Sequence, residues 1–419
     1  MAAVAAELLL EKLAAPAPKS FRRGTHRVVS PSETLQLAGG HAGKMGVTRI
    51  ANVTGLDHIG IPVAMAIRPN SRSLSVSQGK GLTLPQAMAS ALMETIELFH
   101  AEDILARCRV DTYSNIASGS VVAEPKLLAR TSRRFRPDLE MPWIEGCDIL
   151  RCEPCWVPYE LVHTDNTLPR PSHAGYFLGS SNGLASGNHM AEAVSAAICE
   201  LVERDAAAIW QASNSNLRAE RCLDLTTIDD TDSLTLLEKL KQAGIGVRIW
   251  NITSDTGIAA FRCQIRDLPG ARYGQSSTFR GSGCHPARGV ALVRALTEAV
   301  QSRLTRIAGT RDDLSPEDYS EADTDEIWEA LLDVQNSLVA PQDFRDVPDF
   351  VSNDVSDDVT WELDRLRTMG MERLVVVDLT RPEFGIPVVR VVAPGIEGIY
   401  DHPDYTPGKR ALLAQSSVS

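Results

Sequence analysis

One order of segments recurs along this chain and constrains its fold more than any other feature. Two β-rich segments are followed by a short stretch of glycine and small polar residues, and then by a largely apolar helix. The β-rich pairs are 48–55 with 61–69, 143–150 with 155–162, and 247–252 with 258–265. The short stretches are SVSQGKG (75–81), SSNGLASG (180–187) and FRGSGCH (279–285), and the helices are expected at about 85–102, within 188–206, and at about 287–308.

The repeat predicts an α+β fold in which pseudo-repeated β-pair–loop–helix units form sheets with helices packed against them. A fourth β-pair, 374–379 with 386–392, has no helix after it. We expect a helix and a Pro/Ala-rich linker over 1–22, one catalytic-sized domain over 23–405, and a tail over 406–419. Two acidic helical stretches, about 316–337 and 356–369, are expected as an insertion within about 312–370. Chance likeness of α/β segments is the alternative to a true repeat.

Composition narrows the function before any motif is considered. The chain has 419 residues and a formal net charge of −12, which argues against unspecific binding to nucleic acid or to an anionic membrane. Its N-terminus lacks the pattern of a signal peptide, and no apolar run approaches the ~20 residues of a membrane helix. We therefore expect a cytoplasmic protein with reduced thiols.

Glutamates recur at matched positions on the first two helices. Gly81 precedes Glu94 by the interval that separates Gly187 from Glu200, and Glu97 and Glu203 follow three residues later. Residues at i and i+3 share one helix face, and two facing acid pairs repel unless a cation lies between them. Oxygen ligands of this kind suit Mg²⁺. The set Glu94, Glu97, Glu200 and Glu203 thus predicts a magnesium site, although a single ExxE is usually a solvated face.

The third helix varies this layout, and basic residues accompany all three. Its acid is Glu298, and Gln301 stands at the i+3 position. Glycines delivered to helix starts can present backbone N–H groups to phosphate, although glycines there are more often caps and turns. The cations that can neutralise phosphate are Lys80, Arg204, Arg294 and Arg303, and Asn188 and Glu192 can hold ribose or base. Arg303 near a helix end can instead offset the helix dipole. The sequence contains neither a Walker-A lysine motif nor GxGxxG.

The cysteines give weaker signals. Cys152 and Cys155 form a CxxC with Cys147 nearby, but no second pair follows at zinc-finger spacing, and a hairpin turn explains them better. Cys199 is expected in the core, and Cys284 with His285 lacks an evident acidic partner for a catalytic dyad.

Three ordered motifs together resemble the signature of the YcaO family. They are SALMETIE (90–97), SNGLASGN with ELVERDA (181–206), and GSGCHP with RALTEAVQSR (281–303), and the resemblance runs from about residue 23 to 398. The resemblance implies a YcaO-like fold around a central, non-P-loop site for ATP and Mg²⁺. It also implies phosphorylation of a peptide backbone amide oxygen, followed by attack of a nucleophile on the former carbonyl carbon.

The resemblance assigns roles to individual residues. It places Glu94, Glu97, Glu200 and Glu203 on the metal-binding acids, and Arg27, Lys80, Ser90, Asn188, Glu192, Arg204 and Glu298 on nucleotide or phosphate contacts. Thr34 is a fainter match beside Arg27. The catalytic set implied by the resemblance is Glu200, Glu203, Arg204, Gln301 and Arg303.

The branch of the family is suggested by other segments. FRRGTHR, WVPYELVHTD (156–165) and VVAPGIEGIYDHP (391–403) resemble stand-alone members that act with a TfuA-like partner protein, which implies thioamide formation in a ribosomally made peptide or protein. The PxPxP ending of azoline-forming members is not seen in LLAQSSVS. An azoline-forming cyclodehydratase and a non-catalytic nucleotide-binding scaffold stay open as alternatives. A homodimer is compatible with the resemblance, and the substrate peptide is not indicated.

Overall fold

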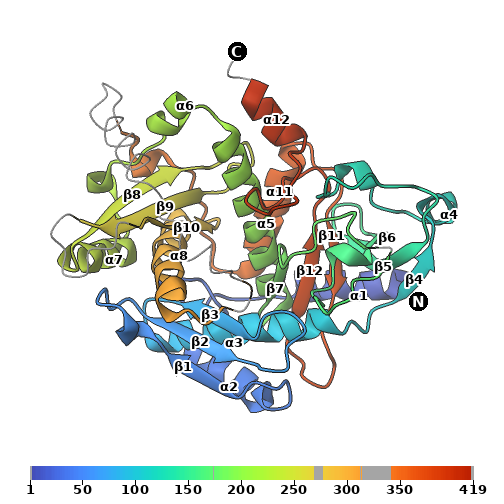
Figure 1. Cartoon of the computed structure of the whole chain (residues 1–419), viewed down its shortest axis with the longest axis horizontal. Helices are drawn as coiled ribbons and strands as arrows, with labels where there is room; N and C mark the ends of the chain where they lie inside the picture. The colour runs from blue at the N-terminus through green and yellow to red at the C-terminus, as the bar shows by residue number, and fades with distance from the viewer. Residues whose placement is uncertain (1, 173, 269–276, 312, 314–340, 417–419) are drawn as a thin grey trace.

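The computed structural model describes residues 2–416 except 173, 269–276, 312 and 314–340, and its described strands form three antiparallel sheets (Figure 1). The first has the order β1-β2-β3 and the second has the order β10-β9-β8. The third is six-stranded, with the order β4-β5-β11-β12-β7 and β6 paired to β5. The strands are β1 Arg49–Asn52, β2 Val63–Ile67, β3 Val76–Lys80, β4 Cys108–Asp111, β5 Met141–Asp148, β6 Glu153–Pro158, β7 Leu184–Ser186, β8 Ile245–Asn251, β9 Ala260–Asp267, β10 Phe279–Cys284, β11 Val375–Asp378 and β12 Val388–Val392.

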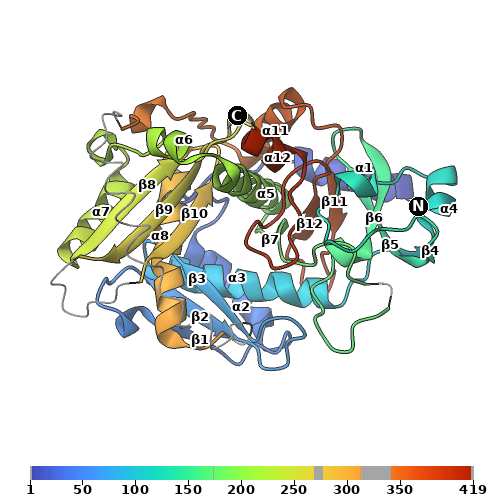
Figure 2. The same ribbon diagram turned by 45° about the horizontal axis from the view of Figure 1, so that its top comes forward.

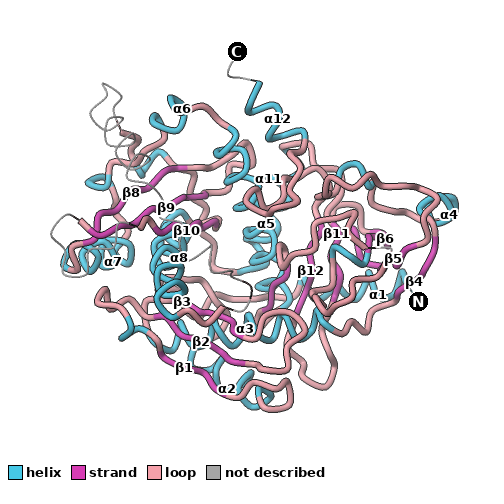
Figure 3. The backbone as a smooth tube through the Cα atoms, viewed as in Figure 1, coloured by secondary structure: helices cyan, strands magenta, loops and turns pink. Residues whose placement is uncertain are grey.

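Helices fill the space between the sheets, with α5 in the middle of the molecule (Figures 1 and 3). The described helices of more than one short turn are α1 Ala2–Ala14, α2 Pro31–Ala42, α3 Leu84–Glu102, α4 Tyr113–Gly119, α5 Met190–Ala212, α6 Ser215–Glu220, α7 Thr231–Gln242, α8 Arg288–Ala308, α11 Val355–Thr368 and α12 Lys409–Ser416. None of these is long and apolar enough to cross a membrane.

The three repeated helices α3, α5 and α8 form where the sequence predicts them. Thr83 caps α3 with a capping box, in which Gln86 bonds back to the cap, and His189 caps α5 by accepting from the Ala191 N–H. The fold class is confirmed as α+β. The prediction of loops was wrong for two of the glycine-rich stretches, which largely form β3 and β10; in the stretch 180–187 only Leu184–Ser186 form a strand, β7, which pairs with β12.

Each repeated helix contacts its own sheet and also the last strand of the next unit. Helix α3 contacts β7, α5 contacts β10, and α8 contacts β3, so the three units close into a ring (Figure 2). The side chains that face the middle of this ring come from all three helices. This cyclic packing is what brings acids from distant parts of the sequence together.

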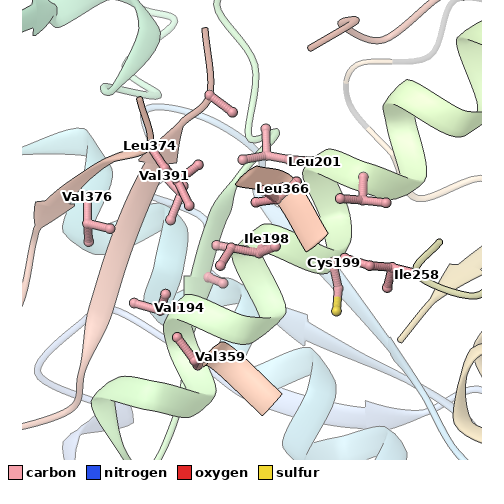
Figure 4. Packing of buried hydrophobic residues seen from close by; sticks show 14 of the residues in the cluster. Val194, Ile198, Cys199, Leu201, Ile258, Val359, Leu366, Leu374, Val376 and Val391 are labelled. Atoms are coloured by element: carbon pink, nitrogen blue, oxygen red, sulfur yellow. The ribbon is translucent and has the colours of Figure 1, made fainter. Parts of the chain in front are cut away.

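The largest described apolar cluster surrounds α5. Val194, Ile198 and Leu201 of α5 pack in it with Val391 of β12 and Leu366 of α11 (Figure 4). Three buried residues of α1, Ala6, Leu9 and Leu13, belong to the same cluster. Burial of apolar surface contributes about 25 cal/mol per Å² to stability. Because the side chains of this core are closely packed, they fix the axis of α5 and therefore the direction in which its acids point.

The fourth β-pair does not form a unit of its own. Strands β11 and β12 insert into the sheet of the second unit, between β5 and β7. Of the two acidic stretches expected as an insertion, 356–369 corresponds to α11, which packs on α5, whereas 316–337 lies outside the described residues. The boundaries expected at residues 22 and 405 stay predictions.

Candidate active site

The acids at matched positions of the three helices, Glu94, Glu200 and Glu298, each accept a hydrogen bond from the segment that precedes their own helix. The backbone N–H of Gln78 donates to Glu94 over 3.3 Å, that of Gly183 donates to Glu200 over 3.1 Å, and that of Ser282 donates to Glu298 over 3.2 Å. The same contact at the same place in three units is strong support for a true structural repeat.

The second set of contacts joins neighbouring units. The backbone N–H and the hydroxyl of Ser186, on β7, donate to Glu97 of α3 over 2.8 and 2.7 Å. Lys80, at the end of β3, donates to Glu298 of α8 in a short ion pair. The acids are therefore positioned by strands on both sides and not by their own helices alone.

Burial raises the pKa of Glu94 and Glu97 on α3 and of Glu200 and Glu203 on α5. Desolvation is the main cause, and it brings the pKa of Glu94 to about 7 and that of Glu97 to about 8, with Glu200 adding repulsion at both. Desolvation also raises the pKa of Glu200 and of Glu203, and Glu298 adds to the rise at Glu203. The Glu203 carboxylate is 2% exposed, and its Oε2 has no hydrogen-bond partner among the described residues.

The third unit has the opposite electrostatic character. Burial alone would raise the pKa of Glu298, but the charges of Lys80 and Arg204 outweigh it and lower that pKa to about 2. Arg204 lies 3.5 Å from Glu203 and 3.9 Å from Glu200, measured between nitrogen and oxygen. Lys80 and Arg204 thus lie near the acids of the site. Their charge does not bring the raised pKa values of the four glutamates on α3 and α5 back to the ordinary value.

Three residues expected to contact nucleotide or phosphate lie together. Arg27, Glu192 and Arg294 line one hollow between the N-terminal segment, α5 and α8. Both oxygens of Glu192 accept backbone N–H groups, from Val28 over 2.6 Å and from Asn188 over 2.7 Å. Glu192 therefore ties the N-terminal segment to the start of α5.

Asn188, just before α5, and Ser90, on α3, are also expected to contact nucleotide or phosphate. The Asn188 amide donates to the Thr34 hydroxyl over 3.0 Å, which links the start of α5 to α2. Ser90 lies one turn before Glu94 on α3, so the two share a helix face. The roles assigned to these residues stay predictions.

Arg303 is not placed with the other expected catalytic residues. It is 2% exposed, and its guanidinium pairs with Asp57 over 2.8 Å and with Asp267 over 2.7 Å. Its position on α8, five residues after Glu298, turns it away from the face that carries that acid. Arg303 joins the turn between β1 and β2 to strand β9 of the second sheet, and its expected catalytic role stays a prediction. Gln301, three residues after Glu298, shares the face of that acid.

The glycines of the third strands have a packing reason rather than an anion-binding one. A Cβ at Gly79 would overlap the backbone of Ala87 and Ala91 on α3, and a Cβ at Gly281 would overlap that of Ala295 and Ala299 on α8. The helices can lie against these strands only where side chains are missing. The expectation that these residues present N–H groups at helix starts is therefore replaced by a different explanation.

Two features of the site were not expected. Arg390, on β12, acts electrostatically on Glu200, and no local motif marks it. His26 and His285 meet edge to face with ring centroids 5.3 Å apart, next to the buried pair of Lys19 and Asp358. Desolvation, with Lys19 adding, lowers the pKa of His26 to about 4, so it is uncharged at neutral pH. The cysteines Cys147, Cys152 and Cys155 form no metal cluster in the described part of the chain.

The sequence model of one family, described as YcaO cyclodehydratase, ATP- and Mg²⁺-binding, matches residues 78–397. The chain belongs to the YcaO family. The match covers all three repeated helices and ends just beyond β12. The cofactors expected from the sequence, ATP and Mg²⁺, are those of the family description.

Other relatives of this YcaO chain agree. It is 36% identical over 379 residues to a Rhizobium leguminosarum bv. trifolii protein, known as the uncharacterized protein in tfuA 3′ region, covering 88% of each chain. Its fold matches a solved YcaO from Methanopyrus kandleri bound with AMPPCP and Mg²⁺, with TM-score 0.72 and 23% identity over 94% of this chain and 99% of that one. A heterocyclase solved in complex with substrate and cofactor matches with TM-score 0.73 and 23% identity over 93% of this chain, which spans only 55% of the heterocyclase.

The donor set of this YcaO chain fits a divalent cation. Four carboxylates from two helices, of which Glu203 is buried and has an unpartnered oxygen, supply hard oxygen ligands of the kind that Mg²⁺ takes alongside phosphate. The raised pKa values show that these carboxyls are destabilised in the ionised form by burial, which a bound cation would relieve.

Proposed function

We propose that this enzyme activates a peptide backbone amide by transferring a phosphoryl group from ATP to the amide oxygen, so that a nucleophile can replace that oxygen. The observation that carries the proposal is the set of four carboxylates with raised pKa values on α3 and α5, of which Glu203 is buried with an unpartnered Oε2 and the other three are half-buried. Such a set destabilises the fold unless it serves a charged ligand.

The chain's own residues would bind and orient the reactants. Glu94, Glu97, Glu200 and Glu203 would hold Mg²⁺ through their carboxylate oxygens. When bound, Mg²⁺ and ATP supply the phosphoryl group and the positive charge that balances it during transfer. Arg204, between Glu200 and Glu203, would contact phosphate oxygens, because a guanidinium can donate to two of them at once.

Lys80 and Glu298 would keep a permanent ion pair at the edge of the site. Because the pKa of Glu298 is lowered to about 2, this acid stays ionised and holds the Lys80 ammonium in place. Glu192 and Asn188 would position the N-terminal segment that carries Arg27 over the nucleotide. The proposed task of the chain is thus placement and charge compensation, without a covalent enzyme intermediate.

The chemistry balances without an oxidant or reductant. An amide oxygen is a poor leaving group, whereas the phosphorylated oxygen leaves as phosphate when the nucleophile bonds to the carbon. If the nucleophile is hydrosulfide, sulfur replaces oxygen, ATP becomes ADP, and the amide oxygen departs on phosphate. The product is then a thioamide.

The relative in the tfuA 3′ region supports the thioamide reaction and a TfuA-like partner protein that delivers sulfur. A ribosomally made peptide or protein is the proposed substrate. The family description and the heterocyclase fold match favour a second candidate, in which a Cys, Ser or Thr side chain of the peptide attacks and an azoline forms. A scaffold that binds nucleotide without chemistry is disfavoured because both acid pairs are intact.

Mass spectrometry of a peptide co-expressed with this chain and a TfuA-like protein separates these candidates. Exchange of oxygen for sulfur adds about 16 Da, whereas cyclodehydration removes about 18 Da. In a purified reaction, ¹⁸O placed in the substrate amide should appear in the released phosphate for both reactions. ATP hydrolysis without ¹⁸O in phosphate would refute amide phosphorylation, and ATP binding without turnover would favour the scaffold.

A further inference from the structure

A second hollow opens beside Glu200, on the other side of α5 from the hollow that Arg27 lines. It is a small hollow whose mouth is open to solvent. Its walls are mostly apolar and come from α5, from the end of β12 and the segment after it, and from the loops near 128 and 178. Among the lining side chains are Leu128, Leu161, Leu178, Leu201, Ile396 and Ile399.

Arg390 lines this apolar hollow with unused hydrogen-bonding capacity. The residue is 2% exposed, and its Nη2 donates to the Ser180 carbonyl oxygen over 2.6 Å. Its Nε and Nη1 have no hydrogen-bond partner within the described part of the chain, and no described carboxylate lies within ion-pair distance. An unpaired buried donor costs about 1–3 kcal/mol, and more when it is charged. Folding alone gives no reason to keep this guanidinium.

Asn182 adds an acceptor to the same hollow. Its Oδ1 is buried and has no partner among the described residues. The hollow is therefore lined by two N–H donors of Arg390 and one oxygen acceptor of Asn182 that have no partner among the described residues. A peptide unit offers the complementary pair, one C=O and one N–H. A free carboxylate would satisfy Arg390 but would leave the Asn182 oxygen unpaired.

The hollow is built partly from the same segments that hold the acids of the candidate site. Gly183, whose N–H donates to Glu200, follows Asn182 directly, and Leu201 follows Glu200 on α5. The segment after β12 is fixed to α5, because the Glu397 N–H donates to Asp205 over 3.0 Å. Burial, opposed by Glu200, lowers the pKa of Arg390 to about 10, so its guanidinium stays charged at neutral pH. A peptide residue in the hollow would lie next to the carboxylates of the site.

We propose that this hollow is the subsite for the apolar residue of the substrate peptide that neighbours the reactive amide. Arg390 donates to the carbonyl oxygen of that residue, Asn182 accepts from its N–H, and the leucine and isoleucine side chains enclose its side chain. This proposal rests on the proposed function and names a feature of its substrate: an aliphatic residue beside the amide that is modified.

The test uses three small probes and the full chain. The probes are N-acetyl-leucine N-methylamide, N-acetyl-glycine N-methylamide and N-acetyl-leucine, and binding is followed by ligand-observed NMR. We expect the leucine methylamide to bind, the glycine methylamide to bind at least about tenfold more weakly, and Arg390→Met to weaken the leucine methylamide by about tenfold or more. Arg365→Met, at a partly buried arginine on α11, is the matched control and should leave probe binding unchanged.

A stability measurement separates a ligand-binding role from a structural one. Because Arg390 has two unpaired donors, Arg390→Met should leave the melting temperature unchanged or raise it. A fall of several degrees would assign Arg390 to the fold and overturn the inference. Equal probe binding by wild type and Arg390→Met, or no binding by wild type, would also overturn it. Tighter binding of N-acetyl-leucine than of its methylamide would overturn the assignment to an internal peptide residue.

The inference and the proposed function fail in different ways. If the function is wrong, probes still bind in the hollow but no peptide substrate stimulates ATP turnover. If the inference is wrong, turnover occurs while the probes do not depend on Arg390. Binding of a non-hydrolysable ATP analogue to Arg390→Met verifies in both cases that the nucleotide site is intact.

Discussion

The third repeated helix differs from the first two in what it does with its charges. On α3 and on α5 two glutamates stand three residues apart and have raised pKa values because they are desolvated. On α8 the acid Glu298 is paired with Lys80 and strongly acidic, the i+3 position is Gln301, and Arg303 joins the turn between β1 and β2 to β9. One scaffold repeated three times thus gives two units that await a ligand and one that is internally neutralised.

The largest expected effect is a loss of stability on substitution of Arg303 in the third unit. Arg303→Met should lower the free energy of unfolding by about 3–5 kcal/mol, because it leaves the buried Asp57 and Asp267 without their cation. Chemical denaturation measures the loss, and the folded fraction should keep its affinity for Mg²⁺ and nucleotide. An unchanged stability with lost ATP turnover would return Arg303 to the catalytic set.

The next effect concerns the second unit. Glu203→Gln should lower ATP turnover by about 10²–10³-fold, equivalent to about 3–4 kcal/mol, through loss of ligand charge in a buried site. The fold should persist, since a neutral amide removes the repulsion between Glu203 and Glu298. Glu238→Gln on α7 changes the same charge at an exposed position and should have no effect. Turnover that survives in Glu203→Gln would contradict the proposed metal site.

The sequence predicts the parts of this comparison that depend on local periodicity. Helices α3 and α8 begin and end within one residue of the expected bounds, and the spacing of Glu94, Glu97, Glu200 and Glu203 is enough to predict a shared site. Insertion of β11 and β12 beside β5 is absent from the prediction, because pairing between distant strands leaves no local pattern.

The glycine-containing strands and the role of Arg390 were not predicted from the sequence, for different reasons. Glycine and polar residues in β3 and β10 resemble a loop by composition, whereas the real constraint is the close approach of a helix backbone, which single-sequence propensity does not encode. Arg390 lies in a run of valines that reads as a buried strand. Only the neighbouring carboxylate of Glu200 and the lack of a partner for its Nε and Nη1 among the described residues distinguish it.

A smaller effect tests whether strand glycines maintain the repeat in all three units. Gly281→Ala should destabilise the fold by about 2–3 kcal/mol, because the added Cβ overlaps the backbone of α8 at Ala295 and Ala299. Gly39→Ala, in α2 with nothing within contact distance of its Cβ, should be neutral or stabilise by up to about 1 kcal/mol. Equal melting temperatures for the two variants would show that helix and strand can separate without loss.

The smallest effect is a pH dependence that the third unit should not share. Burial raises the pKa of Glu94 to about 7 and of Glu97 to about 8, so both carboxyls are largely protonated near pH 6 without a cation. Mg²⁺ must displace these protons, and its affinity should rise by up to about tenfold per pH unit for each proton released. Glu298, with its pKa lowered to about 2, is ionised throughout and adds no slope.

Glu94 and Glu97 also determine whether the free energy of unfolding of the metal-free protein rises or falls with pH. Between the unfolded pKa near 4.5 and the folded values, the folded chain binds more protons than the unfolded chain, so its free energy of unfolding falls as pH rises from about 5 to 8. Calorimetric titration of Mg²⁺ with a non-hydrolysable ATP analogue in buffers of different ionisation enthalpy counts the released protons. Glu97→Gln should remove part of the pH slope, whereas Glu238→Gln should keep it. Magnesium affinity that is constant across this pH range would mean that the acids on α3 and α5 are already ionised, and the contrast with α8 would then be one of spacing alone.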